Sequence, residues 1–292
     1  MNVDFGCVVL TMGKRPEELR SAVESLISQK DVTLEIIIVG NGWDPQEEFP
    51  QMRTLFLREN LGIPAGRNAG AKEVSGTYLF FLDDDVLLSD QRTLVKMKEL
   101  MSSQSEIALI QPRVIALKEG EKTPARWVPR LRIGDEKESS VATSLWEGAT
   151  AIDHRLFDEI GGWPANFFYA HEGIELVWRV LDHGKLPWYA ADIEVKHPVI
   201  NPARHDYYYF LNARNRVWLA KRNLRFPFSF LYTLTWILIS LIRIRDMKGR
   251  KAWFMGLFQG LFTESQSSGE RMKKLRWKTH WLLTRYGRPP II

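Results

Sequence analysis

Cysteine is almost absent from this sequence of 292 residues. The single cysteine, Cys7, lies inside the first apolar run, so no disulfide can form within the chain. A reducing compartment suits such a composition. The first residues also lack the basic segment with which a secretory signal peptide begins, so we expect no signal peptide. Internal repeats and low-complexity segments are lacking as well.

Acidic residues are scarce in the last third of the sequence. Residues 201–292 carry 18 Lys and Arg against 4 Asp and Glu, a net charge of +14. Residues 1–200 carry 22 against 31, a net charge of −9. This asymmetry suggests an acidic, metal-binding body and a basic tail that faces an anionic partner.

The GxGxxG fingerprint of dinucleotide-binding proteins is also missing. Residues 5–10 and 34–39 are apolar runs of strand length, and Pro16 begins a helix between them. Strand, helix and strand in this order open a doubly wound α/β fold. After the second strand, residues 40–43 read Gly-Asn-Gly-Trp, which disfavours a dinucleotide oxidoreductase.

Three consecutive aspartates follow a buried strand. Residues 77–82 read Thr-Tyr-Leu-Phe-Phe-Leu, and Asp83, Asp84 and Asp85 come next. In an open α/β sheet, ligands bind at this end of the strands. Alternation along the strand points Asp83 and Asp85 the same way and Asp84 the opposite way. A divalent cation held by Asp83 and Asp85 would relieve the repulsion, whereas the alternative is a solvated acidic turn.

A glycine-rich loop precedes this strand. Residues 58–70 read Arg-Glu-Asn-Leu-Gly-Ile-Pro-Ala-Gly-Arg-Asn-Ala-Gly, with Arg67 entering the next helix. One interpretation is an ordinary loop and helix start. The other is a site where backbone amides and the Arg67 guanidinium approach an anion.

In this order, these motifs resemble the nucleotide-sugar half of family 2 glycosyltransferases, which have the GT-A fold. The resemblance covers roughly residues 3–220 and is specific only as a combination. It implies an α/β protein whose central sheet is mostly parallel and flanked by helices. It also implies an inverting enzyme of the bacterial cell-envelope or polysaccharide type. The residues implied in nucleotide-sugar binding are Thr11, Asn41, Arg67, Asn68, Asp83, Asp84 and Asp85.

The family resemblance also implies a metal site. In relatives, a histidine after the last strand of the domain commonly completes it, and His197 is in that place. Imidazole together with Asp83 and Asp85 suits Mn²⁺, with Mg²⁺ as the alternative.

The sequence departs from the family at two positions. Gly40 stands where relatives commonly have an Asp that contacts the nucleobase or ribose, and Asn41 is expected to take over part of this contact. The family motif Glu-Asp-x-Asp-Leu, whose carboxylate serves as general base, here becomes Glu-Gly-Ile-Glu-Leu over residues 172–176. Glycine therefore occupies the second position of this motif as well.

Two carboxylates remain as catalytic candidates, Glu172 and Glu175. Glu175 is four residues before Arg179, the favourable spacing for an ion pair on a helix. A paired carboxylate has a lowered pKa and is a poorer base. We therefore expect Glu172 to be the base.

Three residues are expected to contact the acceptor. Trp163 is interpreted either as a platform for the apolar face of a sugar or as a core tryptophan. His171 adjoins the proposed base. Arg214 lies in the apolar stripe of a helix predicted over residues 206–224, where a guanidinium needs either a structural salt bridge or a diphosphate.

The tail has the composition of a membrane-interface segment. Residues 226–242 carry no charge, which is at the short edge of what spans a bilayer. Basic clusters with interleaved Trp and Phe follow, as in helices that lie on anionic membranes. We expect a peripheral protein on the cytoplasmic face of the cell membrane, without a nucleic-acid partner because no recognition motif is present. A helical appendage packed on the body is the alternative.

The sequence thus predicts a GT-A domain over residues 1–224 and a basic, aromatic helical tail over residues 225–292. Within the domain, residues 1–110 form the nucleotide-sugar half and residues 111–224 the acceptor half. The expected reaction is inverting sugar transfer from a nucleoside diphosphate sugar to a hydroxyl of a lipid-linked cell-envelope or capsule glycan. Alternatives are a polyprenyl-phosphate sugar synthase, a nucleotidyltransferase and a non-catalytic membrane-bound scaffold.

Overall fold

A central β-sheet with helices on both faces forms the body of the protein. The computed structural model describes residues 3–200, 207–263, 265 and 273–291. The strands are β1 (Phe5–Thr11), β2 (Leu34–Asn41), β3 (Arg53–Leu57), β4 (Tyr78–Asp83), β5 (Ile107–Ala116), β6 (Ser140–Val141), β7 (Ala149–Asp153) and β8 (Leu186–His197). The helices are α1 (Pro16–Ile27), α2 (Ile63–Ala71), α3 (Thr93–Ser103), α4 (His154–Glu159), α5 (Glu172–Asp182), α6 (Tyr208–Asn223), α7 (Phe228–Arg243), α8 (Met247–Phe262) and α9 (Trp277–Tyr286). Two 3₁₀ turns are η1 (Ala125–Trp127) and η2 (Ala165–Phe167).

The sheet is mixed, with strand order β3-β2-β1-β4-β7-β5-β8-β6. Strands β1 to β4 are parallel to one another, as are β5 and β8. Strand β7 runs antiparallel between β4 and β5, and β6 antiparallel beside β8. The mostly parallel α/β sheet predicted from the sequence is confirmed.

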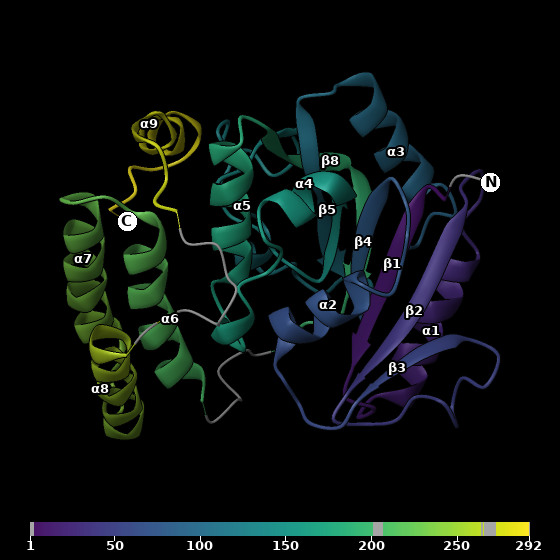
Figure 1. The fold of residues 1–292 in the computed structure, drawn as a ribbon, viewed down its shortest axis with the longest axis horizontal. Helices are drawn as coiled ribbons and strands as arrows, with labels where there is room; N and C mark the ends of the chain where they lie inside the picture. The colour runs from purple at the N-terminus through teal and green to yellow at the C-terminus, as the bar shows by residue number, and fades with distance from the viewer. Residues whose placement is uncertain (1–2, 201–206, 264, 266–272, 292) are drawn as a thin grey trace.

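Alternate residues of β1 belong to two different cores. Phe5, Cys7 and Val9 pack with α1 and α3 on one face of the sheet. Val8 and Leu10 pack with α2, α4 and α5 on the other face. Because both faces are covered, the central strand β1 is apolar and buried along nearly its whole length, as parallel strands usually are. Figure 1 shows α1 and α2 on opposite sides of the sheet.

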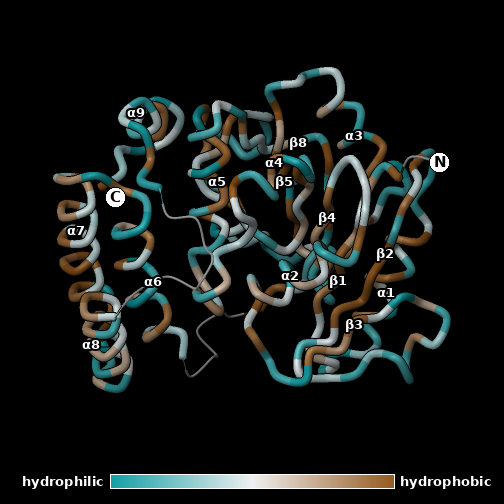
Figure 2. The backbone as a smooth tube through the Cα atoms, in the orientation of Figure 1, coloured by the Kyte–Doolittle hydropathy of each residue, from teal (hydrophilic) through white to brown (hydrophobic). Residues whose placement is uncertain are grey.

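Helices α6 to α9 form a helical block beside α5, at one end of the sheet (Figure 1). The uncharged run predicted at 226–242 corresponds to α7, which carries hydrophobic colours along its length in Figure 2. Within the described ranges, no helix has both the length and the hydropathy required to cross a bilayer. The helix predicted over 206–224 corresponds to α6, and residue 206 lies outside the described residues. The predicted boundary after residue 110 falls inside β5.

A buried ion cluster joins the body to this helical block. The Glu175 carboxylate is fully buried and accepts from Arg179 on the same helix, so the predicted ion pair is confirmed. Arg222 of α6 donates from Nε to both Glu175 oxygens, at 2.9 and 3.1 Å. Arg222 is itself 1% exposed. One carboxylate therefore fixes the position of α5 relative to α6.

We expect the substitution Glu175→Gln to lower the free energy of unfolding by about 3–5 kcal/mol, because it leaves two buried guanidinium groups without their counter-charge. Urea denaturation with an unchanged m-value would measure the loss. The control is Glu159→Gln in the exposed pair with Arg155, which should cost less than about 1 kcal/mol. Equal losses in the two variants would contradict the role given to the buried cluster.

Candidate functional site

Three parallel strands end at one edge of the sheet and present polar side chains there. Thr11 ends β1, Asn41 ends β2 and Asp83 ends β4. In the strand register, Leu10 lies beside Asp83, which brings these ends together. Since ligands bind beyond the carboxyl ends of the strands in open α/β sheets, this edge is the candidate site.

The three aspartates contact two arginines and a histidine from three different segments. Asp83 accepts from Arg67 Nη2 of α2 at 2.7 Å. Asp84 and Asp85 both contact the guanidinium of Arg15, in the loop after β1. The Asp85 carboxylate also lies 3.4 Å from His197 Nε2 at the end of β8. The carboxylates therefore hold the loop after β1, helix α2 and the end of β8 close to one another.

Asp84 and Asp85 differ in acidity because their surroundings differ. Burial raises the pKa of Asp84 to about 6, although Arg15 and the Thr11 hydroxyl at 2.7 Å oppose this shift. Burial also acts on Asp85, but His197 and Arg15 outweigh it and lower the pKa of that carboxyl below its ordinary value. Asp85 is thus the more persistent anion of the two.

Two cavities open at this edge. The first, of about 550 Å³, is lined by Thr11, Asn41 and Asp84 among others. The second, of about 270 Å³, is lined by two acidic groups, Asp83 with Asp85 and Glu147 with Glu172, together with His197, Trp127 and Trp146. Arg15, Ile63, Asp83 and Tyr169 line both cavities, so the two adjoin.

The alternation expected of the aspartates agrees with these linings. Asp85 lines only the second of the two cavities and Asp84 only the first, whereas Asp83 lines both. Asn41 shapes the floor of the first cavity because its side chain accepts from Leu61 N at 2.8 Å and donates to Gly62 O at 3.1 Å. These bonds fix the turn that leads into α2.

Arg67 lines the second cavity from its buried side. Its side chain is 1% exposed and donates to Asp83 and to the carbonyl of Glu147. Nε and Nη1 have no partner among the described residues. The guanidinium also lies 5.0 Å from the centre of the Trp163 ring. A buried cation with free donors beside a cavity is suited to an anionic ligand.

Trp163 and Asn68 support the site without lining either cavity. Trp163 is completely buried and packs edge-on against Phe81 of β4. The Asn68 side chain bonds the backbone of Trp163 in both directions, at 2.8 and 2.9 Å. Of the two interpretations of Trp163, the structure therefore gives the core tryptophan, and the predicted acceptor contact at this residue is not formed by its ring.

The glycine at position 173 makes room for Glu147. Glu147 Oε1 accepts from Gly173 N at 3.0 Å. A Cβ atom at residue 173 would overlap the Glu147 carboxylate. Helix α5 thus begins with Glu172 in the second cavity and with the Glu147 carboxylate against its first turn. The carboxylate that the sequence lacks at position 173 is present in space, supplied from the segment before β7.

Glu172 is a carboxyl with unusual acidity. It is 3% exposed, and its Oε2 has no hydrogen-bond partner among the described residues. Burial and then the nearby Glu147 raise the pKa of Glu172 to about 8. Burial also raises the pKa of Glu147, although Arg67 opposes this shift. Both acids line the second cavity, and the pKa of each is raised above its ordinary value.

The loop before α5 is held in an unfavourable backbone conformation. Phe168, Ala170 and His171 have φ values of 64°, 76° and 72°. For residues other than glycine, such a conformation costs about 1–2 kcal/mol each. Asn215 of α6 compensates, since its Nδ2 donates to the carbonyls of three residues of this loop at 2.7–2.9 Å. The loop sets the direction in which Glu172 enters the cavity.

Arg214 and His171, predicted to contact the acceptor, line neither cavity. Arg214 donates to the carbonyls of Asn166 and Phe167 and lies 4.2 Å from the centre of the Trp218 ring. Burial, followed by nearby Arg216 and Arg130, lowers the pKa of His171 well below its ordinary value, so the imidazole is neutral. The Arg214 side chain thus supports the segment that leads into the strained loop, to which His171 itself belongs.

Sequence patterns alone did not identify several residues of the site. Arg15 follows a lysine in a loop, and no pattern separates the two. Glu147 lies 26 residues from its partner Gly173, so helical spacing cannot reveal the contact. Trp127 and Trp146 pack edge-on against His197, at ring distances of 4.9 and 5.2 Å. The density of tryptophan near these positions was the only signal available.

The donor atoms at the junction of the cavities suit a hard divalent ion. Among the described residues, no three His, Cys, Asp or Glu side chains are grouped closely enough to enclose a metal. Asp85 and His197 are neighbours, Asp83 lines the same cavity, and His197 Nδ1 is buried without a partner among the described residues. Such a partial set fits an ion that takes its remaining ligands from a phosphate-bearing substrate.

Comparison with known sequences finds one family. Residues 7–161, more than half of the chain, match the model for Glycosyl transferase family 2. Glycosyltransferase GlyA from Streptococcus pneumoniae is 31% identical over 99 residues, which are 31% of this chain and 14% of GlyA. The uncharacterized glycosyltransferase YibD from Escherichia coli is 31% identical over 101 residues, 31% of this chain and 29% of YibD. The chain thus spans well under half of the length of these relatives.

Solved structures share the fold at low sequence identity. GalNAc-T7 with UDP, GalNAc and Mn²⁺ matches with a TM-score of 0.64 and 14% identity, over 93% of this chain and 58% of its own. PcManGT, a mannosyltransferase from Pyrobaculum calidifontis with GDP-Man and Mn²⁺, matches with a TM-score of 0.60 and 12% identity. The match covers 90% of this chain and 88% of PcManGT. TarS 1-349 from S. aureus with UDP-GlcNAc matches with a TM-score of 0.62 and 13% identity. The match covers 88% of this chain and 81% of TarS 1-349. The predicted GT-A fold is thereby confirmed.

The packing of Glu147 against Gly173 predicts a change of sign in a double-mutant cycle. Gly173→Ala alone should destabilise the protein by about 1–3 kcal/mol, because the added methyl group displaces a packed carboxylate. In a Glu147→Ala background, the same substitution should stabilise by roughly 0.5–1 kcal/mol, the usual advantage of alanine inside a helix. Thermal or urea unfolding of the four proteins measures the coupling. Additive effects would show that the two residues do not touch.

Proposed function

The chain belongs to glycosyl transferase family 2, and from this premise we propose that it transfers a sugar from a nucleoside diphosphate sugar to a hydroxyl of a glycan acceptor, with inversion at the anomeric carbon. One observation carries the proposal. The two cavities adjoin at Asp83, and the second contains Glu172, a buried carboxyl whose Oε2 has no partner among the described residues. Donor and acceptor can therefore meet in front of a base.

The nucleotide of the donor is proposed to occupy the first cavity. Its size of about 550 Å³ and its aromatic lining by Phe168, Tyr169 and Tyr208 suit a stacked nucleobase. Asn41 and Thr11 offer polar contacts at its floor. Neighbours of the same fold hold UDP, GDP-Man or UDP-GlcNAc, which supports a donor of this class. The sugar would then extend past Asp83 into the second cavity.

Mn²⁺ or Mg²⁺ is proposed to bind where the cavities meet. Asp83, Asp85 and His197 would hold the ion, and two structural neighbours contain Mn²⁺. Such an ion neutralises the charge that develops on a departing diphosphate. Arg15 lies beside the same carboxylates and would face the same phosphates. Arg67, with two free donor nitrogens, would contact the donor from the opposite side.

Glu172 is the proposed general base. It takes the proton from the acceptor hydroxyl while the acceptor oxygen forms a bond to the anomeric carbon and the bond from that carbon to the diphosphate oxygen breaks. A single displacement of this kind inverts the configuration. A base works best when its pKa lies near the working pH, and the pKa of Glu172 is raised to about 8.

Glu147 acts through Glu172 as a positioning residue. Its carboxylate is bound to Gly173 N in the first turn of α5, one residue after the base. Its charge also contributes to the raised pKa of Glu172. In this way Glu147 raises the proton affinity of the base, and it fixes the start of the helix that carries the base.

The acceptor is proposed to be a lipid-linked cell-envelope or capsule glycan, reached from the cytoplasmic face of the membrane. Trp127 and Trp146 line the second cavity and suit the apolar face of a sugar. Large apolar side chains are exposed on α7 and α8, among them Phe230, Leu238 and Phe258. Together with the +14 charge of residues 201–292, they support peripheral binding to an anionic membrane.

The substitution Glu172→Gln should lower the transfer rate roughly 10²–10⁴-fold, the usual contribution of general base catalysis. Donor affinity should change little, because the side chain acts on the acceptor hydroxyl. Product formation from a panel of nucleotide sugars, with the anomeric configuration determined by NMR, would measure both activity and inversion. Full transfer to a polyprenyl phosphate by the variant would instead support a synthase, since a phosphate acceptor needs no base.

The acid limb of the pH profile provides a second measurement. Because the base must be deprotonated, kcat/KM should rise with pH and level off above about pH 8. Glu147→Gln keeps an oxygen for Gly173 N but removes a negative charge that raises the pKa of Glu172. The limb should therefore move to lower pH in this variant. If the acid limb of the Glu147→Gln variant lies at the same pH as that of the unmodified protein, Glu147 does not affect the pKa of the base.

Asp85→Asn should abolish the Mn²⁺-dependent part of nucleoside diphosphate binding, because an amide is a much weaker ligand than a carboxylate. Calorimetric titration with and without Mn²⁺ would measure the difference. Asp158→Asn on α4 is the control, since that carboxylate is 73% exposed and lines neither cavity. Metal-dependent affinity equal to that of the unmodified protein would remove Asp85 from the ligand set.

A further inference from the structure

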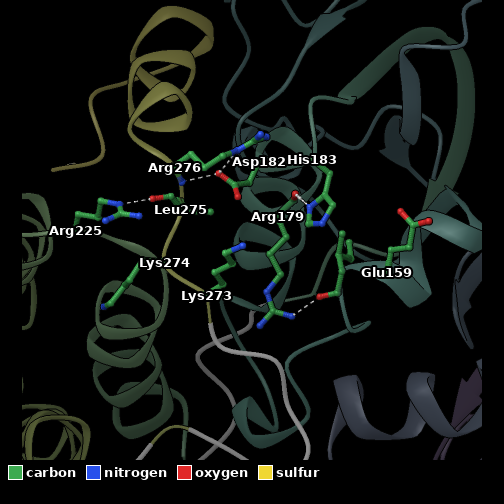
Figure 3. Close-up of a pocket in the computed structure, with 10 residues that line it drawn as sticks. Glu159, Arg179, Asp182, His183, Arg225, Lys273, Lys274, Leu275 and Arg276 are labelled. Atoms are coloured by element: carbon green, nitrogen blue, oxygen red, sulfur yellow. Dashed lines mark hydrogen bonds and ion pairs between the residues drawn. The ribbon is translucent and has the colours of Figure 1, made fainter.

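A third cavity, of about 380 Å³, lies between the body and the helical block and shares no lining residue with the two cavities of the proposed active site. It is formed by the end of α4, the end of α5, Arg225 after α6 and residues 273–276 before α9. Figure 3 shows Lys273 and Arg276 extending from this last segment toward α5, with Arg225 and Lys274 on its other side. Five of its ten lining residues are Arg or Lys, against two acids.

Both acids of this cavity are already engaged. Glu159 pairs with Arg155, with 2.9 Å between Oε1 and Nε. Asp182 Oδ1 accepts from Arg276 N at 2.7 Å and from the Thr279 hydroxyl. Arg276 Nε lies 3.7 Å from the same Asp182 oxygen, and Arg179 pairs with Glu175. The carboxylates therefore compensate two of the five cations and leave three without a carboxylate partner among the described residues.

Three cations of the cavity have no carboxylate partner in the part of the chain that the structure describes. The Lys274 ammonium donates to the carbonyl of Lys221, and Arg225 Nε donates to the carbonyl of Leu275 at 2.8 Å. No hydrogen bond of the Lys273 side chain to a described residue is present. Burial, and then repulsion from Arg225 and Lys221, lowers the pKa of Lys274 below its ordinary value. Like charges gathered in a cavity favour an anionic ligand.

We propose that this third cavity binds a phosphate group, held by Lys273, Lys274, Arg225 and Arg276. A phosphate has several acceptor oxygens and a charge that matches the Lys and Arg donors with which two segments line the cavity. The site is separate from the donor diphosphate. It lies at the end of α5 opposite Glu172, beyond the buried Glu175 cluster.

The surroundings favour a lipid headgroup as the source of the phosphate. Arg225 lies 5.8 Å from the ring of Trp277, which is half exposed, and Phe226 beside it is 77% exposed. Trp281 on α9 is 72% exposed. Exposed aromatic side chains next to a basic pocket are typical of proteins that insert into the headgroup region. This part of the inference rests on the proposed membrane association, whereas phosphate binding itself does not.

The test uses the full chain and the double variant Lys273→Gln/Lys274→Gln. Its matched control is Lys248→Gln/Lys251→Gln, which removes the same charge from exposed positions of α8 outside the cavity. Calorimetric titration with glycerol 1-phosphate and inorganic phosphate, at constant ionic strength, measures the free anion. Sedimentation with phosphatidylcholine vesicles, with and without phosphatidylglycerol, measures the headgroup. Neither assay involves turnover, so failure of the proposed reaction would not affect it.

We expect the cavity variant to lose affinity for phosphatidylglycerol vesicles by at least about tenfold more than the control, since each basic residue at an anionic surface contributes a few-fold to tenfold. Saturable binding of the soluble phosphates that the cavity variant alone loses would assign the site to a free anion instead. Lys273→Gln alone, at a residue without a described contact, should show the same trend if Lys274→Gln perturbs folding. Equal behaviour of cavity variant and control in both assays overturns the proposal.

Discussion

Mutual repulsion among Asp83, Asp84 and Asp85 is the constraint on which the site depends. The strand that delivers them is buried up to Leu82, and Asp84 and Asp85 are themselves buried, so these two charges have little water to stabilise them. The chain responds by bringing Arg15 from the loop after β1, Arg67 from α2 and His197 from β8 to the same place. These three side chains come from segments on both sides of β4, so the contacts of one short stretch fix the relative positions of much of the sheet edge.

A different solution operates at the neighbouring pair of acids. Glu147 and Glu172 line the second cavity, and Arg67 opposes the rise of their pKa values without reversing it. Repulsion and burial therefore raise the pKa values, in contrast to Asp85, whose pKa is lowered by adjacent cations. One cavity thus contains a carboxylate that remains ionised and a carboxyl that exchanges its proton near neutral pH. Such a division separates binding of a cation from general base chemistry.

Sequence patterns over a few residues predicted those parts of the structure that depend on contacts between near neighbours in the chain. The strands β1, β2 and β4 and the pair Glu175–Arg179 follow from apolar runs and from helical spacing, both of which act over a few residues. Arg15 meets its aspartates across about seventy positions of the chain, and Glu147 meets Gly173 across 26. Gly173 replaces an acid of the family motif. Because it has no side chain, it leaves room for the carboxylate of Glu147, which is distant in sequence. Similarly, no sequence pattern distinguishes a buried Trp163 from an exposed one.

The helical block is too closely packed on the body to act as an independent appendage. Helix α8 lies against α6 so tightly that a Cβ atom at Gly256 would overlap the carbonyl oxygen of Phe210. Helix α6 in turn supplies Arg222 to the buried Glu175 and Asn215 to the strained loop in front of Glu172. A bond network therefore runs from the helices that carry the exposed apolar side chains to the helix that carries the proposed base. Removing α7 to α9 would uncover α6 and disturb Glu172 as well, so the role of the exposed apolar residues can be separated from that of Glu172 only by surface substitutions that leave this packing intact.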